Sequence, residues 1–292
     1  MNMLFDLLMS IISSALLFVI LKKFSSWGVV TVHGILFNYF TAAGLSLLLS
    51  DLDWTIARNH ILIAWPYTIG IGLLFILVFV LTGITAQKNG MATASIASKM
   101  SMVIPISIGI VFYKDSMDIQ KGIGLAMALP AVLLTVDQSG SKTQGRFDLR
   151  FWLLPILLFL GAGLVDSAIK FAQHILMGDG NDYLIIAMIF ASAGCFGLIK
   201  LTYDSFAGKE PLKWVSFLGG LLLGSVNFCS LYFLVRCLDS PGAESSFVFA
   251  IVNVGVVLLS FFIGWMVFNE KPNARKIIGL VLALISIVVL AV

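Results

Sequence analysis

The sequence has very little charge. Only 11% of its 292 residues are Asp, Glu, Lys or Arg, and 60% are hydrophobic. A soluble domain usually has about 25% charged and about 45–50% apolar residues. A water-soluble core cannot absorb such an apolar excess, because wide apolar patches would remain in contact with water. The composition therefore predicts an integral membrane protein, with membrane lipid as a partner and the plasma membrane as its location.

Several other features are missing, and each absence excludes a class of protein. The net charge is only +3, with no run of five or six like charges, so we expect no nucleic-acid partner. The three cysteines show neither CxxC pairs nor metal-ligand spacing, so we expect no disulfide framework and no metal site. There is no Walker A motif and no HExxH motif. We expect no cofactor and no enzymatic activity.

Long apolar runs fill most of the chain. A helix that crosses a membrane needs about 20 mainly apolar residues. The first run has no basic residue before it and no cleavage pattern after it, so we interpret it as a span and not as a signal peptide. We predict an all-α integral membrane protein with ten transmembrane helices, at residues 3–21, 30–50, 63–86, 91–113, 120–136, 151–173, 183–203, 214–236, 243–268 and 275–291.

The two halves of the chain resemble each other. Residues 1–137 and 151–292 each hold five spans, with a polar connector at 138–150. Charged residues and glycines recur at similar spacing in both halves: Asp115 aligns with Glu270, Lys121 with Lys276, Gly124 with Gly279 and Gly90 with Gly242. Because five spans is an odd number, the second copy would enter the membrane from the opposite face. We therefore predict two inverted five-helix repeats, a design found in many secondary transporters.

A short pattern at the end of each half also resembles a known family. An acidic residue after the penultimate span is followed by a polar turn and then by Lys-x-x-Gly-Leu, in which the lysine is Lys121 in the first half and Lys276 in the second. This pattern is similar to that of the ten-helix EamA-type members of the drug/metabolite transporter superfamily. The resemblance covers essentially the whole chain, although Asp115 replaces the more usual Glu. It implies a central cavity surrounded by spans one to four and six to nine, with spans five and ten at the periphery.

Polar residues deep in a span are costly unless they pair or face water, so each is a candidate for substrate binding. Lys99 is the deepest charge, and Ser95 lies one turn before it on the same helical face. Pro105 removes a backbone hydrogen bond and is expected to act as a hinge. Lys99 would bind a substrate carboxylate or phosphate; the alternative is a structural ion pair with a carboxylate on a neighbouring helix.

Four further residues are substrate-binding candidates with equally plausible structural roles. Asn227, Asn253 and Asn38 would bind substrate or form hydrogen bonds between helices. Asp166 would bind substrate or a proton, or pair with Lys170 one turn later. The repeat aligns Asp166 with an apolar position, which counts against a place in the cavity.

These observations predict a secondary transporter, driven without ATP, that moves a small-molecule substrate such as an amino acid by alternating access. The alternatives are a passive channel, a membrane scaffold or, less favoured, an intramembrane enzyme. A homodimer remains open. Lys and Arg are more frequent in the loops after odd-numbered spans, and this bias favours both termini outside.

Overall fold

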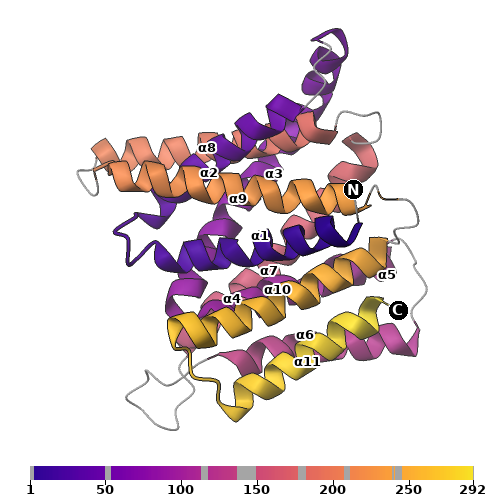
Figure 1. Ribbon diagram of the computed structural model, residues 1–292. Helices are drawn as coiled ribbons and strands as arrows, with labels where there is room; N and C mark the ends of the chain where they lie inside the picture. Colours follow the sequence, from indigo (N-terminus) through magenta and orange to yellow (C-terminus); the bar gives the residue numbers. More distant parts are fainter. Residues whose placement is uncertain are drawn as a thin grey trace. The chain divides into compact units, whose positions relative to one another are not determined.

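The computed structural model describes residues 3–49, 54–112, 118–136, 149–176, 182–206, 211–238, 240 and 245–291. All the regular elements in these ranges are α-helices, in agreement with the predicted all-α class (Figure 1). They are α1 (Met3–Lys23), α2 (Thr31–Leu49), α3 (Trp54–Lys88), α4 (Met91–Met100), α5 (Val103–Phe112), α6 (Ile119–Thr135), α7 (Leu149–Leu176), α8 (Asp182–Phe206), α9 (Trp214–Leu238), α10 (Ser245–Phe268) and α11 (Ala274–Ala291).

The helices have the length and the surface of membrane spans. Eight helical segments within the described ranges are long and apolar enough to cross a bilayer, and α6 is a shorter apolar helix. Large apolar side chains lie on the outside of the helices: Leu48 is 81% exposed, Ile119 86% and Met266 75%. Such a surface is unfavourable in water but suits lipid. The described chain is therefore a membrane-embedded helical protein with about eight to ten spans.

One predicted span differs from the structure. The fourth predicted span is two helices, α4 and α5, interrupted at Ser101 and Met102. The third predicted span, 63–86, agrees with the apolar part of α3, Ile61–Lys88, and the helix itself begins earlier, at Trp54. The connector at 138–150 lies almost entirely outside the described residues.

The chain forms two compact units that do not follow the two halves of the sequence. The first unit contains Met1–Lys22, Leu81–Gly163 and Cys229–Val292, and the second contains Lys23–Val80 and Leu164–Phe228. Each unit therefore takes helices from both halves. The chain changes unit within α3, α7 and α9, and also directly after Lys22, near the end of α1.

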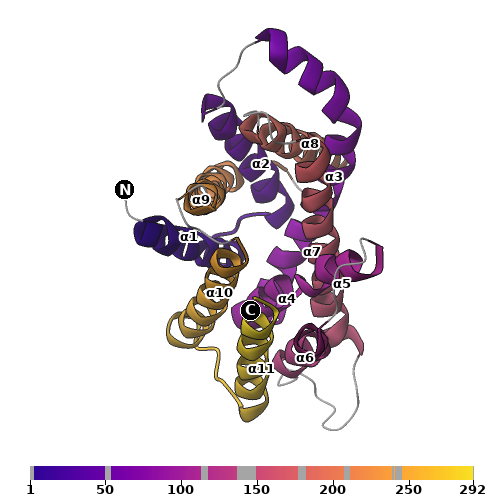
Figure 2. The same ribbon diagram turned by 90° about the vertical axis from the view of Figure 1, so that its right-hand side faces the viewer.

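In the first unit, α6 packs along α11, as Figures 1 and 2 both show. Two glycines bring these helices close together. A β-carbon at Gly124 would lie 2.6 Å from Leu290 Cγ, and one at Gly279 would lie 2.8 Å from Thr135 Cγ2. The Ser286 hydroxyl donates a 2.8 Å hydrogen bond to the Gly124 carbonyl. Since the start of each helix contacts the end of the other, α6 and α11 are antiparallel.

In the second unit, α2 packs along α8 (Figure 2). A β-carbon at Gly197 would lie 2.9 Å from Leu36 Cδ1, and one at Gly194 would lie 3.0 Å from the Phe40 ring. Phe40 follows Leu36 along α2, but its contact Gly194 precedes Gly197 along α8. This pair is therefore also antiparallel.

Candidate functional site

The interruption of the fourth span is the main irregularity near the predicted binding residues. Pro105 has no N–H to donate to the Ser101 carbonyl, and the ring of a proline crowds the carbonyl four residues earlier. Ile104 N–H bonds to the Ser101 carbonyl instead, at 2.9 Å, and the Ser101 hydroxyl donates to the Ser98 carbonyl at 2.5 Å. The local sequence thus explains why the helix stops here. Whether Pro105 acts as a hinge stays a prediction.

Two of the predicted binding residues lie beside this interruption. Lys99 is in the last turn of α4 and is partly exposed. A cation at this end of a helix is favoured by the helix dipole, which is a structural reason for a lysine here. Asn253 lies on α10, which packs against α4, and its amide contacts the Met102 sulfur at 3.7 Å. The fold therefore places Asn253 next to the interruption that follows Lys99.

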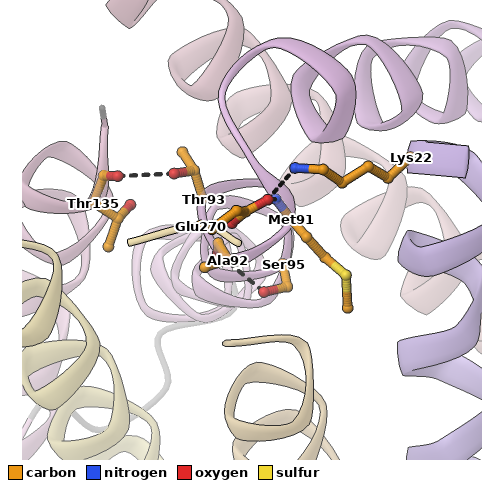
Figure 3. Close-up of polar contacts among 7 residues, drawn as sticks. All are labelled: Lys22, Met91, Ala92, Thr93, Ser95, Thr135 and Glu270. Atoms are coloured by element: carbon orange, nitrogen blue, oxygen red, sulfur yellow. Dashed lines mark hydrogen bonds and ion pairs between the residues drawn. The ribbon is translucent and has the colours of Figure 1, made fainter. Parts of the chain in front are cut away.

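Ser95 is differently placed from Lys99. It is fully buried, and its hydroxyl donates to the Ala92 carbonyl of its own helix at 3.0 Å (Figure 3). The Thr93 hydroxyl donates to the Thr135 carbonyl at 2.8 Å and ties α4 to the end of α6. A hydroxyl that already bonds to its own backbone is a weaker candidate for binding substrate than Lys99 or Asn253.

The other predicted binding residues belong to the second unit. Asn227 on α9 donates its side-chain amide to the Asn38 side-chain carbonyl on α2 at 3.1 Å. Asn38 is fully buried, and its own amide nitrogen has no hydrogen-bond partner among the described residues. A β-carbon at Gly224 would lie 2.6 Å from the Asn38 backbone carbonyl, so α2 and α9 are closely packed here. Asp166 is partly exposed on α7.

Sequence reasoning missed a polar cluster in the first unit, in which Glu270 follows α10 (Figure 3). The Glu270 carboxylate forms an ion pair with Lys22 at the end of α1. The same Oε1 atom accepts a 2.8 Å hydrogen bond from the backbone N–H of Met91, the first residue of α4. Two glycines make room for it, since a β-carbon at either Gly90 or Gly264 would lie 2.9 Å from Glu270 Oε2. Gly90 also has φ +100°, a conformation that favours glycine.

A second ion pair holds the other end of α1. Arg236 on α9 lies 3.6 Å from the Asp6 carboxylate, and its guanidinium lies 5.4 Å from the centre of the Tyr232 ring. One turn and two turns further along α1, Ser10 and Ser14 form hydrogen bonds to Ser230. Sequence alone gave no reason to connect residues more than 200 positions apart. Within the described ranges, no group of three His, Cys, Asp or Glu side chains is arranged to hold a metal ion.

Comparisons with known proteins are consistent with the fold but name no function. No family model matches the chain. An uncharacterised protein from Haemophilus influenzae is 25% identical over 292 residues, covering 98% of this chain and 96% of the relative. A crystal structure whose description names no activity has a TM-score of 0.56 and 13% identity, and the match covers 96% of each chain. At this identity the structural match shows a shared fold alone.

Proposed function

We propose that this protein is a secondary transporter that carries a small organic anion or zwitterion, such as an amino acid, across a membrane by alternating access. It would do so with two inverted five-helix repeats, as in the EamA-type family that the sequence resembles. The proposal rests on the paired arrangement of equivalent helices and on the interrupted fourth span.

The contacts between α6 and α11 are the observation that carries the proposal. Gly124 lies against Leu290, and its repeat equivalent Gly279 lies against Thr135, the repeat equivalent of Leu290. Such reciprocal contacts are what an internal two-fold relation between the halves would produce. The α6–α11 and α2–α8 pairs are each formed by equivalent spans of the two halves, and each is antiparallel, as inversion requires.

The interrupted span supplies a place for substrate recognition. Transporters with inverted repeats commonly bind substrate near discontinuous helices at the middle of the membrane. In this chain the interruption at Ser101 and Met102 follows Lys99 closely and contacts Asn253. A lysine would recognise a carboxylate or phosphate, and the amide of Asn253 would supply a hydrogen bond. This chemistry favours an anionic or zwitterionic solute over a purely cationic one.

A carrier fits these features better than the alternatives. A passive channel or a scaffold would need neither equivalent antiparallel pairs nor a lysine beside an interrupted helix. The division into two units that each include helices from both halves suits a mechanism in which one unit moves against the other. We retain the channel as the second candidate because saturation kinetics distinguish the two directly.

The test begins with a thermal-shift screen of metabolites on the purified protein, because a ligand that binds the folded state raises its melting temperature. Counterflow of each hit is then measured in reconstituted vesicles for wild type, Lys99→Arg and Lys99→Met. We expect saturable counterflow that Lys99→Arg retains and Lys99→Met reduces about 30-fold or more, the loss for a desolvated charge contact of about 2 kcal/mol or more. Non-saturable flux would contradict a carrier, and unchanged transport by Lys99→Met would remove Lys99 from the mechanism.

A further inference from the structure

Three helices of the first unit meet at one carboxylate. Glu270 joins the end of α1 through Lys22 and the start of α4 through the Met91 N–H, and it lies in the turn after α10 (Figure 3). We refer to Glu270, Lys22 and the Met91 N–H as the Glu270 clasp.

Glu270 is held in place by contacts other than its ion pair. Its backbone N–H donates to the Gly264 carbonyl at 3.0 Å, and the preceding residue, Asn269, has φ 54°. The carboxylate rests against Gly90 and Gly264 and faces the N-terminus of α4, where the helix dipole favours a negative charge. The Met91 side chain is fully buried, so the start of α4 is anchored. The carboxylate would therefore remain partnered if Lys22 left.

Lys22 is the partner that can leave. Its side chain is long and flexible and is 17% exposed, and that of Glu270 is 13% exposed, so neither side chain is fully enclosed. The Lys22 Nζ atom also lies 5.2 Å from the centre of the Phe268 ring.

Lys22 lies where the chain passes from the first unit to the second, so its release would affect the connection between them. Lys22 is the last residue of the first unit before the chain passes into the second unit at Lys23. The other three changes of unit occur within the continuous helices α3, α7 and α9. The change after Lys22 lies in the last turn of α1, directly before the turn that joins α1 to α2, where chain movement is easiest. The clasp fixes the first-unit end of that turn.

We propose that the Glu270 clasp is a releasable latch: Lys22 leaves the carboxylate when the second unit moves relative to the first, while Glu270 stays on the N-terminus of α4. The latch rests on the proposed alternating-access function, since that function supplies the movement. Its position suits a contact that holds one state of the transport cycle until movement begins.

The experiment joins positions 22 and 270 covalently, so that they can no longer separate. In a protein whose native cysteines are replaced by alanine, Lys22→Cys and Glu270→Cys are joined by a short reducible crosslinker. Amide hydrogen exchange is then followed for residues 23–30 of the turn, where the Trp27 N–H bonds to the Lys23 carbonyl and the Val29 N–H to the Phe24 carbonyl. If the latch opens in the native protein, the crosslink slows exchange there by about tenfold or more relative to the uncrosslinked cysteine-free parent.

The matched control is the other ion pair on α1. Asp6→Cys and Arg236→Cys are joined with the same reagent, about 24 Å away along the helix. We expect this crosslink to leave exchange at 23–30 unchanged. Equal exchange in the parent and in the Lys22–Glu270 crosslinked protein would show a permanent brace and overturn the proposal, and so would equal slowing by the control crosslink.

Transport provides a second readout that separates the latch from the proposed function. Counterflow of a solute identified in the screen should fall about tenfold or more on crosslinking and recover when the crosslinker is reduced. Full transport by the crosslinked protein would overturn the latch while leaving the carrier function intact. If no solute shows saturable flux, the proposed function fails, and hydrogen exchange still decides whether the latch opens.

Discussion

Asn227 on α9 donates a 3.1 Å hydrogen bond from its side-chain amide to the side-chain carbonyl of Asn38 on α2. Asn38 is fully buried, whereas Asn227 is partly exposed. From sequence, each asparagine was equally suited to binding substrate or to joining helices. The geometry favours a structural role for Asn38, because its carbonyl already bonds to a neighbouring helix.

The first prediction concerns this pair. Asn38→Leu keeps the branched shape and the number of side-chain heavy atoms but removes the acceptor, so the melting temperature should fall, with a loss of about 0.6 to 1.7 kcal/mol expected for a hydrogen bond between membrane helices. The Michaelis constant for transport should stay unchanged. Ser225→Ala is the control, since the exposed Ser225 hydroxyl donates to the Leu221 carbonyl of its own helix. A changed Michaelis constant with unchanged stability would instead make Asn38 a binding residue.

The second prediction concerns the α6–α11 contact. Gly124→Ala and Gly279→Ala each place a β-carbon within 2.8 Å of a side chain on the partner helix. We expect each to destabilise the protein by about 1–3 kcal/mol, measured as denaturant or thermal unfolding in detergent. Gly70→Ala is the matched control, because a β-carbon added at Gly70 would meet no neighbouring atom within 4 Å and alanine favours helix by up to about 1 kcal/mol.

If the two halves are related by a two-fold axis, the two glycine substitutions should lower the stability of the protein by similar amounts. Gly124→Ala and Gly279→Ala should destabilise by amounts within about 1 kcal/mol of each other, since they occupy equivalent places. A large effect at one glycine and none at the other would contradict the two-fold relation between the helices.

The third prediction separates two residues near the interrupted span. Ser95→Ala should leave transport within about twofold of wild type, because the Ser95 hydroxyl bonds to the Ala92 carbonyl of its own helix. Asn253→Ala should raise the Michaelis constant of an anionic solute by about tenfold, the effect of losing one hydrogen bond to a charged group. Counterflow kinetics at several solute concentrations measure both. The reverse ranking would place Ser95, not Asn253, in the binding site.

Much of the fold follows from sequence because lipid imposes a simple rule. A span must be long, apolar and helical, so α1, α2, α8 and α9 lie within a few residues of their predicted positions. The apolar part of α3, Ile61–Lys88, also agrees with the predicted span, although the helix begins seven residues earlier, at Trp54, because polar residues can continue a helix beyond its apolar part. The interruption at Ser101 agrees with the expected effect of Pro105, which acts on the carbonyl four residues earlier.

The polar contacts were much harder to predict, because they join residues far apart in the chain. Nothing in the local sequence connects Lys22 with Glu270 or Asp6 with Arg236. Gly90 and Gly264 were the feature of the sequence that could have indicated this cluster, because a glycine lets a carboxylate approach the backbone closely. Their role becomes evident only when the fold brings Glu270 between them.

The substrate-binding residues remain predictions of different strength. Lys99, Ser95, Asn253 and Pro105 lie in the first unit, and Asn38, Asn227 and Asp166 lie in the second. Of these, Lys99 and Asn253 are brought close to the interrupted span, whereas Ser95 and Asn38 already have structural partners. Asp115, which the predicted repeat aligns with Glu270, lies outside the described residues.

The fourth prediction tests the inverted relation of the halves, on which the transport mechanism depends. Small epitope tags are placed at residue 1 and, separately, at residue 137, before the second half begins. Their accessibility to antibody is measured in intact cells and after permeabilisation. Five crossings between the tags should place them on opposite sides of the membrane, and tags on the same side would contradict the inverted repeat and the carrier mechanism with it.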